Sequence, residues 1–116
     1  MLRESGKINN EDYNLQGAVD PTVDSGVEHG RELVNFASAV AGTDEAALVA
    51  ARSALLEAMG SPAVVSASVI AANFSMLDRI ANVIGIGLDD MFVKPSAEIR
   101  DMLGINAYPS AANTLG

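Results

Sequence analysis

The stretch from Ser61 to Gly85 constrains the fold most, because it is a long apolar segment that must be covered on most of its sides. Ser61 is a good helix N-cap, Pro62 suits the first helical position, and Gly85 is a typical helix stop. At 100° per residue, the apolar side chains form two neighbouring stripes that together cover roughly 200° of the circumference. The first stripe contains Ile70, Phe74, Leu77, Ala81 and Ile84, and the second contains Val69, Ala72, Met76, Ile80 and Val83. We expect this helix to be the longest and most buried element.

A membrane span is the alternative for this segment, because no charged residue occurs between Ala58 and Leu77, about the length that crosses a bilayer. Against it, Ser66, Asn73 and other polar residues interrupt the run, and no basic flank anchors it. The abundant Ala, Ser and Gly residues instead favour helices that approach each other closely. We therefore expect a buried helix and no membrane as a partner.

Two further helices precede this one and are joined by very short turns. We expect the first over residues 27–41, ended by Gly42. Thr43 is then the predicted N-cap of a second helix, which has the sequence DEAALVAARSALLEAM and stops at Gly60. Because connections of one or two residues force consecutive helices to turn back, an antiparallel hairpin arrangement follows.

The remaining segments complete the predicted fold, which is an all-α, small antiparallel helical bundle. It has three main helices plus a short C-terminal helix over residues 96–103. Residues 1–26 are rich in Gly, Asn and charge, so we expect an extended or flexible N-terminal arm. Residues 27–105 are the predicted helical domain, and residues 106–116 are a polar C-terminal tail. No strand pattern competes with the helical one.

Net charge and the lack of cysteine exclude several classes of function. The chain has 15 acidic and 7 basic residues and a net charge of −8, so neither nucleic acid nor an anionic membrane is an expected partner. Without cysteine, thiol catalysis, disulfides and thiolate metal sites are excluded. The first residues lack the basic-then-apolar pattern of a secretory signal, so we expect a cytoplasmic protein.

His29 is the single histidine and the main candidate for acid–base chemistry. The helical projection places it near the Phe36 side of the first helix, with Glu28 and Glu32 as neighbours. His29, Glu28 and Glu32 are therefore the catalytic candidates, although a histidine in a first helical turn more often caps a loop or packs beside an aromatic ring. No metal-ligand spacing and no nucleotide- or phosphate-binding motif is present, so we expect no metal and no cofactor.

Asn73 and Arg52 are polar residues on otherwise apolar faces, which makes them the candidates for ligand binding. A buried amide without hydrogen bonds costs about 1–3 kcal/mol. We therefore expect Asn73 to be buried and bonded, either across helices, where it fixes the packing register, or in a ligand cavity. Arg52 is expected to pair with a carboxylate, Asp78 being the candidate, to reach the edge of its face, or to bind an anion.

Residues 67–90, ASVIAANFSMLDRIANVIGIGLDD, resemble the helix and following turn near the carboxyl end of many carboxymuconolactone decarboxylase/alkylhydroperoxidase-D-like proteins. The preceding segment, TDEAALVAARSALLEAMGSP, is compatible with the same pattern, so the likeness covers about residues 43–105. The resemblance implies an all-α oligomeric bundle, frequently trimeric or hexameric, in which helices from different subunits share the core.

Peroxidatic members of that family carry the motif E-x-x-C-x-x-C-x-x-x-H, which this chain lacks. No catalytic residue is therefore transferred from the resemblance, and we do not expect a thiol peroxidase. The chain would then be either a degenerate member or a shortened one that corresponds to the part downstream of the motif.

Two classes of function follow from these observations. The first is a non-catalytic or degenerate homo-oligomer, a dimer or trimer, that binds a protein partner, such as a related chain, or a small apolar ligand. The second is a cysteine-independent, decarboxylase-like enzyme that uses His29 with a nearby Glu. We favour the first, because an enzyme needs converging polar groups and the sequence shows few. The expected contact between copies uses the second apolar stripe, with Val69, Met76 and Val83.

Overall fold

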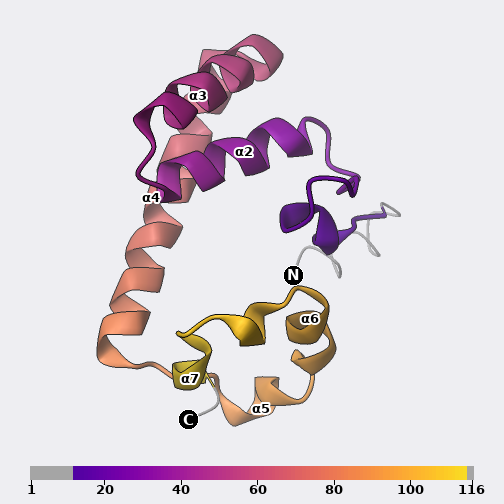
Figure 1. The fold of residues 1–116 in the computed structure, drawn as a ribbon, viewed down its shortest axis with the longest axis vertical. Coiled ribbons are helices and arrows are strands. Elements are labelled where there is room, and N and C mark those ends of the chain that lie inside the picture. Colours follow the sequence, from indigo (N-terminus) through magenta and orange to yellow (C-terminus); the bar gives the residue numbers. More distant parts are fainter. Residues whose placement is uncertain (1–11, 115–116) are drawn as a thin grey trace. The chain divides into compact units, whose positions relative to one another are not determined.

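The computed structural model describes residues 12–114, and these form helices and turns without any strand. The three long helices are α2 (Gly30–Ala41), α3 (Glu45–Met59) and α4 (Ser61–Ile84) (Figure 1). The short elements are η1 (Leu15–Ala18), α5 (Asp90–Val93), α6 (Ala97–Met102), η2 (Ile105–Ala107) and α7 (Ala111–Thr114). The all-α prediction is confirmed, whereas the antiparallel bundle stays a prediction.

The chain separates into two compact units, and the division lies inside α4. The first unit extends to Ser75 and the second begins at Met76. The predicted limits of the helical domain and of the tail stay predictions, because a division into compact units does not show which parts fold alone.

Local sequence signals explain the turn between α2 and α3. α2 ends at Ala41, and the N–H of the C-cap residue Gly42 donates back to carbonyls in the last turn of the helix. The side chain of Asp44 accepts a hydrogen bond from the Ala47 N–H at 3.1 Å and so caps α3. The prediction that Thr43 is this cap is wrong by one residue, because Asp44 has the extended backbone that an N-cap requires.

α2 and α3 lie side by side and supply the core of the first unit (Figure 1). Phe36 of α2 is 3% exposed and Leu55 of α3 is 0% exposed. These two are the buried hydrophobic side chains in the described part of the chain. A core of this size is small for a chain of this length. Burial of apolar surface is the main term that stabilises a fold, so this core contributes little of it.

The segment before α2 forms η1 and a series of turns. Arg31 of α2 holds the segment by donating from Nη2 to the Val23 carbonyl at 2.8 Å and to the Asp20 carbonyl at 3.4 Å. These bonds fix residues 20–23 against the first turn of α2. Residues 1–11 of the predicted arm lie outside the described residues.

α2 begins at Gly30, three residues later than predicted. His29 precedes it with a φ of 52°, a left-handed conformation that is uncommon outside glycine. Gly30 lies so close to Ser25 that a Cβ added at Gly30 would clash with the Ser25 side chain. The packing of the preceding turn, rather than helical periodicity, therefore sets the start of α2.

α4 is the longest helix at 24 residues, as predicted. Gly60 separates it from α3 and has a φ of 82°, which glycine adopts without a steric cost. Ser61 is the first helical residue, so its predicted N-cap role is wrong by one position, because Gly60 occupies the non-helical position. At the other end Gly85 has a φ of 68°, and the Ile86 N–H donates to the Ala81 carbonyl at 3.0 Å, which is the Schellman pattern.

The prediction that α4 is the most buried element is wrong for the single chain, since none of its residues is buried. Apart from the half-buried Val64, its large apolar side chains are between 48% and 85% exposed. They are Val65, Val69, Ile70, Phe74, Met76, Leu77, Ile80, Val83 and Ile84. The apolar pattern shows that these side chains need cover, but the core of the first unit forms between α2 and α3 instead.

Arg100 of α6 organises the second unit and is 8% exposed. Its guanidinium donates to the Val93 carbonyl at 3.0 Å, to Asn106 Oδ1 at 3.3 Å and to the Ser96 hydroxyl. Asn106 in turn donates from Nδ2 to Asp101 Oδ1 at 2.7 Å. One buried cation therefore connects the end of α5, the start of α6 and η2.

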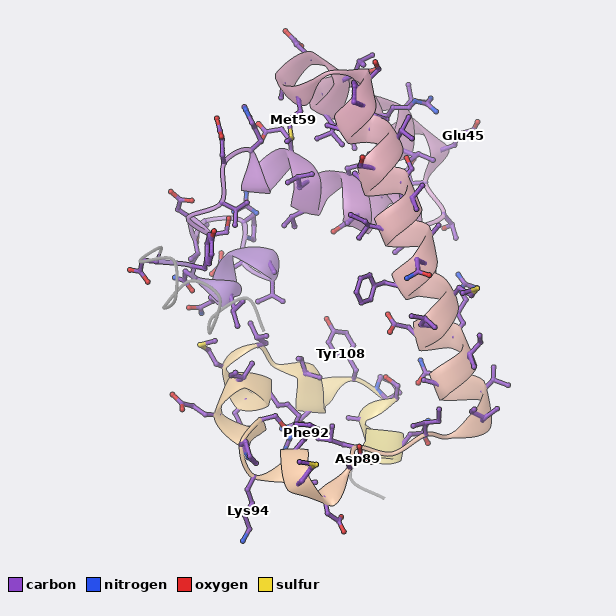
Figure 2. The ribbon with its side chains drawn as sticks, turned by 180° about the vertical axis from the view of Figure 1, so that it is seen from behind. Glu45, Met59, Asp89, Phe92, Lys94 and Tyr108 are labelled. Atoms are coloured by element: carbon purple, nitrogen blue, oxygen red, sulfur yellow. The ribbon has the colours of Figure 1, made fainter. Side chains whose placement is uncertain are left out.

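The predicted helix over residues 96–103 is present as α6, and Gly104 follows it with a φ of 67°. The polar tail, for which no structure was predicted, contributes η2 and α7. Phe92 and Tyr108 of this unit are 50% and 62% exposed (Figure 2). The second unit therefore relies more on hydrogen bonds around Arg100 than on an apolar core.

Candidate functional site

The three catalytic candidates do not converge. Nε2 of His29 lies 3.8 Å from Oε1 of Glu28, and the two side chains are 37% and 92% exposed. An exposed contact of this kind contributes little to the stability of the fold. Glu32 lines a groove between α2 and α3, and neither His29 nor Glu28 is part of that lining. His29 itself precedes α2 and makes no side-chain cap bond, so its predicted place inside the first helical turn is wrong by one residue.

The groove between α2 and α3 is open and has a volume of about 710 Å³. Small and polar side chains line it, namely Glu32, Asn35, Ser38, Ala39, Gly42, Thr43, Asp44, Ala47, Ala50, Ala51 and Ala54. Two carboxylates are present without a basic side chain, and Asp44 is already engaged as the cap of α3. The histidine–carboxylate pair of the decarboxylase-like alternative therefore does not lie in this groove.

Neither ligand-binding candidate lines this groove. Asn73 is exposed on α4, so the prediction that it is buried is wrong for the single chain. Arg52 is exposed on α3, and its predicted pairing with Asp78 stays a prediction, because Asp78 belongs to the second unit. Across residues 12–114, no group of three or more acidic or histidine side chains is placed to hold a metal ion.

The exposed face of α4 is the surface that stands out, because its residues follow a regular spacing. Intervals alternate between three and four residues along Ser66, Val69, Asn73, Met76, Ile80 and Val83, which we name the α4 seam. Ile70, Leu77 and Ile84 each follow one of the seam residues and repeat every seven residues. A seven-residue repeat of this kind is typical of a helix that packs along another helix.

The opposite face of α4 carries smaller side chains and is partly covered. Val64, Ala67, Ala71 and Ser75 are half-buried there. The Ser68 hydroxyl on the same face donates to the Val64 carbonyl at 2.7 Å, so this polar group is satisfied within the helix. α4 therefore has mostly small residues on its partly covered face and large apolar residues on its exposed face.

Sequence reasoning found the residues of the seam but not its repeat. The two predicted stripes described the width of the apolar arc, and the second stripe was predicted to form the contact between copies. The period of seven that relates Val69 to Met76 and Val83 is an additional signal for that contact surface. That period distinguishes pairing along one neighbouring helix from general burial.

α4 is also long and apolar enough to cross a membrane, with a mean hydropathy of 1.3, and it is the one such helix in the described part of the chain. Length and composition alone are weak evidence for a span, because a helix that packs inside a protein has the same properties. A membrane is therefore a competing occupant of the α4 surface.

No family model, curated protein or solved structure matches this chain. The resemblance of residues 67–90 to the carboxymuconolactone decarboxylase/alkylhydroperoxidase-D-like family stays a prediction. The candidate site therefore depends on the geometry of α4.

Proposed function

We propose that the protein is a non-catalytic helical oligomer whose copies bind each other through the α4 seam and the apolar residues beside it. The observation that carries this proposal is the exposure of a row of large apolar side chains on a helix with no buried residue. Contiguous apolar patches of this kind on soluble proteins mark interaction sites. The alkylhydroperoxidase-D-like resemblance agrees with it, since it implies subunits that share their core.

The free energy available from this surface is sufficient for association. Seven large side chains on it, Val69, Ile70, Met76, Leu77, Ile80, Val83 and Ile84, are about half exposed or more. Complete burial of such a side chain contributes about 1.5–3 kcal/mol, so the exposed part of each contributes about 1 kcal/mol. Two copies then gain roughly 10–20 kcal/mol, which exceeds the middle of the range of about 4–15 kcal/mol that association costs.

The corresponding area also reaches the scale of a specific contact. At about 25 cal/mol per Å², the gain corresponds to roughly 400–800 Å² of apolar surface per pair of copies. Because apolar atoms make up about 60% of an interface, the total approaches the roughly 1,000 Å² that a specific interface needs. We therefore expect association at protein concentrations of tens to about a hundred micromolar.

A second protein copy fits this surface better than a lipid bilayer. The uncharged part of α4, residues 61–77, is about 25 Å long at 1.5 Å per residue, whereas the hydrocarbon core is about 30 Å thick. Asp78 and Arg79 follow directly, and each costs about 2.5–3.5 kcal/mol at the centre of a membrane. A related chain with the same seam would bind in the same way as a second copy.

The test is the mass of the full chain in solution, measured by size exclusion with light scattering at tens of micromolar. We expect an oligomer. Met76→Asp places a charge on the seam. It should weaken the association at least tenfold, because pairing would then remove the new carboxylate from water. Asn82→Asp is the matched control, since Asn82 is exposed on the side of α4 away from the seam and should keep the wild-type mass.

Two results would contradict the proposal. One is a monomeric wild-type chain that unfolds cooperatively at these concentrations. The other is flotation of the wild-type chain with neutral phospholipid vesicles that is lost in Met76→Asp, because the seam would then serve a membrane.

A further inference from the structure

Asn73 interrupts the α4 seam at its middle. It lies between Val69 and Met76 along the seam, and it is close to the midpoint of a helix that extends from Ser61 to Ile84. Its side chain is exposed in the single chain, where water can satisfy the amide. When the seam is covered, this amide leaves water and needs a new partner.

The chemistry of an amide restricts what that partner can be. The side chain of Asn has an N–H₂ donor and a carbonyl acceptor, so a full match must both accept and donate. The seam contains no charged residue, and its other polar residue, Ser66, lies two helical turns away. A second copy of Asn73 supplies the required donor and acceptor in one group.

We infer that two copies of the chain pair with twofold symmetry so that Asn73 faces Asn73 of the partner subunit and sets the register of the two α4 helices. This inference rests on the proposed self-association and adds its register and stoichiometry. A single Asn in an apolar seam is known to specify register and oligomeric state in paired helices. A slip of one repeat would place Asn73 opposite Ile80 of the partner subunit and leave the amide unsatisfied. Such a slip should weaken pairing by roughly 5- to 150-fold.

The position of Asn73 near the midpoint adds support from geometry. Pairing that superimposes this residue on its copy lets the two helices overlap over almost their whole length, whether they are parallel or antiparallel. Any other register shortens the contact and exposes apolar side chains at both ends. The hydrogen bond of the amides and the burial of the apolar residues therefore favour the same register.

A cysteine scan tests the inference directly, because the chain has no cysteine of its own. Asn73→Cys should form a disulfide between two copies on mild oxidation, since a disulfide requires Cα atoms about 4.4–6.8 Å apart. Asn82→Cys is the control, because it lies nine residues further along α4 and therefore on the opposite side of the helix. It should react with a soluble thiol reagent but should not form the covalent dimer under the same conditions.

The outcomes separate this inference from the proposed function. A monomeric wild-type chain contradicts both. An oligomeric wild-type chain in which Asn73→Cys cross-links no faster than Asn82→Cys contradicts the register while leaving self-association intact. Cross-linking of Asn73→Cys that stops with one chain in three unpaired indicates a trimer and contradicts the twofold pair. Near-complete cross-linking at position 73 alone supports it.

Asn73→Leu provides a second measurement that does not depend on disulfide geometry. The substitution removes the polar group from the seam, so association should tighten while its specificity decreases. We expect larger or mixed assemblies by sedimentation velocity, with unchanged helix content. A single dimeric species with unchanged affinity would contradict a role of Asn73 in setting register.

Discussion

Leu55→Ala is the sharpest test of how the first unit is held together. Leu55 of α3 has no exposed surface and Phe36 of α2 is 3% exposed, and they are the buried hydrophobic side chains in the described part of the chain. Removing three carbon atoms from Leu55 takes away buried apolar contacts and leaves a cavity that the surrounding structure can close only in part. The substitution should therefore destabilise the packing of α2 on α3 without affecting the propensity of α3 to be helical, because alanine is a strong helix former.

The size of the effect can be worked out from burial. Leu→Ala substitutions in cores cost about 2–5 kcal/mol, and the lower values occur where the site can collapse. The core here is small, so the site can collapse in part and we expect about 2–3 kcal/mol. Because small domains have total stabilities near the lower end of about 5–15 kcal/mol, this is about half of the free energy of unfolding.

The measurement is urea unfolding followed by far-ultraviolet circular dichroism at one fixed protein concentration. With a denaturant dependence of about 1–3 kcal/mol per molar urea, the midpoint should fall by about 1–2 M. Leu56→Ala is the matched control, since Leu56 is the next residue on α3 and is 49% exposed, so it should cost less than about 1 kcal/mol. Equal losses for the two variants would refute the assignment of Leu55 as the core residue between the helices.

Two further predictions concern local hydrogen bonds in the first unit. Asp44→Ala should cost about 1 kcal/mol in urea unfolding, because it removes the bond to the Ala47 N–H, whereas Asp44→Asn, which keeps an N-cap acceptor, should cost only a few tenths. The hydroxyl of Thr22 donates to Asp20 Oδ1 at 2.7 Å and its N–H donates at 2.8 Å, and these bonds lower the pKa of Asp20 below its ordinary value. Because the pKa of Asp20 is lower in the folded chain, its carboxylate stabilises the fold at pH values above the pKa of the unfolded chain. This stabilisation is lost as the pH falls through the pKa of the folded chain. Thr22→Val should raise the Asp20 pKa toward its ordinary value in a carboxyl NMR titration, and an unchanged pKa would contradict the role of the hydroxyl.

Helix boundaries could be predicted from the sequence wherever a local signal determines them. Gly42, Gly60 and Gly85 end helices as expected, because each supplies a conformation or a connection that a helix cannot continue through. The start of α2 was predicted three residues too early, because His29 and Gly30 are fixed by contact with the turn before them. Contacts of that kind depend on tertiary packing and leave no periodic pattern in the sequence.

Burial was predicted less well than helicity, and the reason is physical. Periodicity shows which side of a helix is apolar, but it does not show which neighbour covers that side. The broad apolar arc of α4 was correctly predicted, but the prediction that α4 is the most buried element was wrong for the single chain, because the buried hydrophobic side chains, Phe36 and Leu55, lie on α2 and α3. Arg100 is the reverse case, since its backbone acceptor on Val93 and its side-chain acceptor on Asn106 follow no spacing that identifies a buried cation.

The small core and the exposed α4 face are best explained together. A chain whose described hydrophobic core consists of Phe36 and Leu55 buries too little apolar surface to offset its conformational entropy comfortably. The seven large side chains on the exposed α4 face represent more apolar surface than that core, and they are stabilising only when something covers them. Folding and pairing would then be coupled. Met76→Asp would lower the free energy of unfolding as well as the mass of the assembly. Leu55→Ala would weaken pairing only because it reduces the fraction of chains that are folded. In the proposed pair, the seam would supply the apolar contact that the single chain lacks, and Asn73 would restrict that contact to one register.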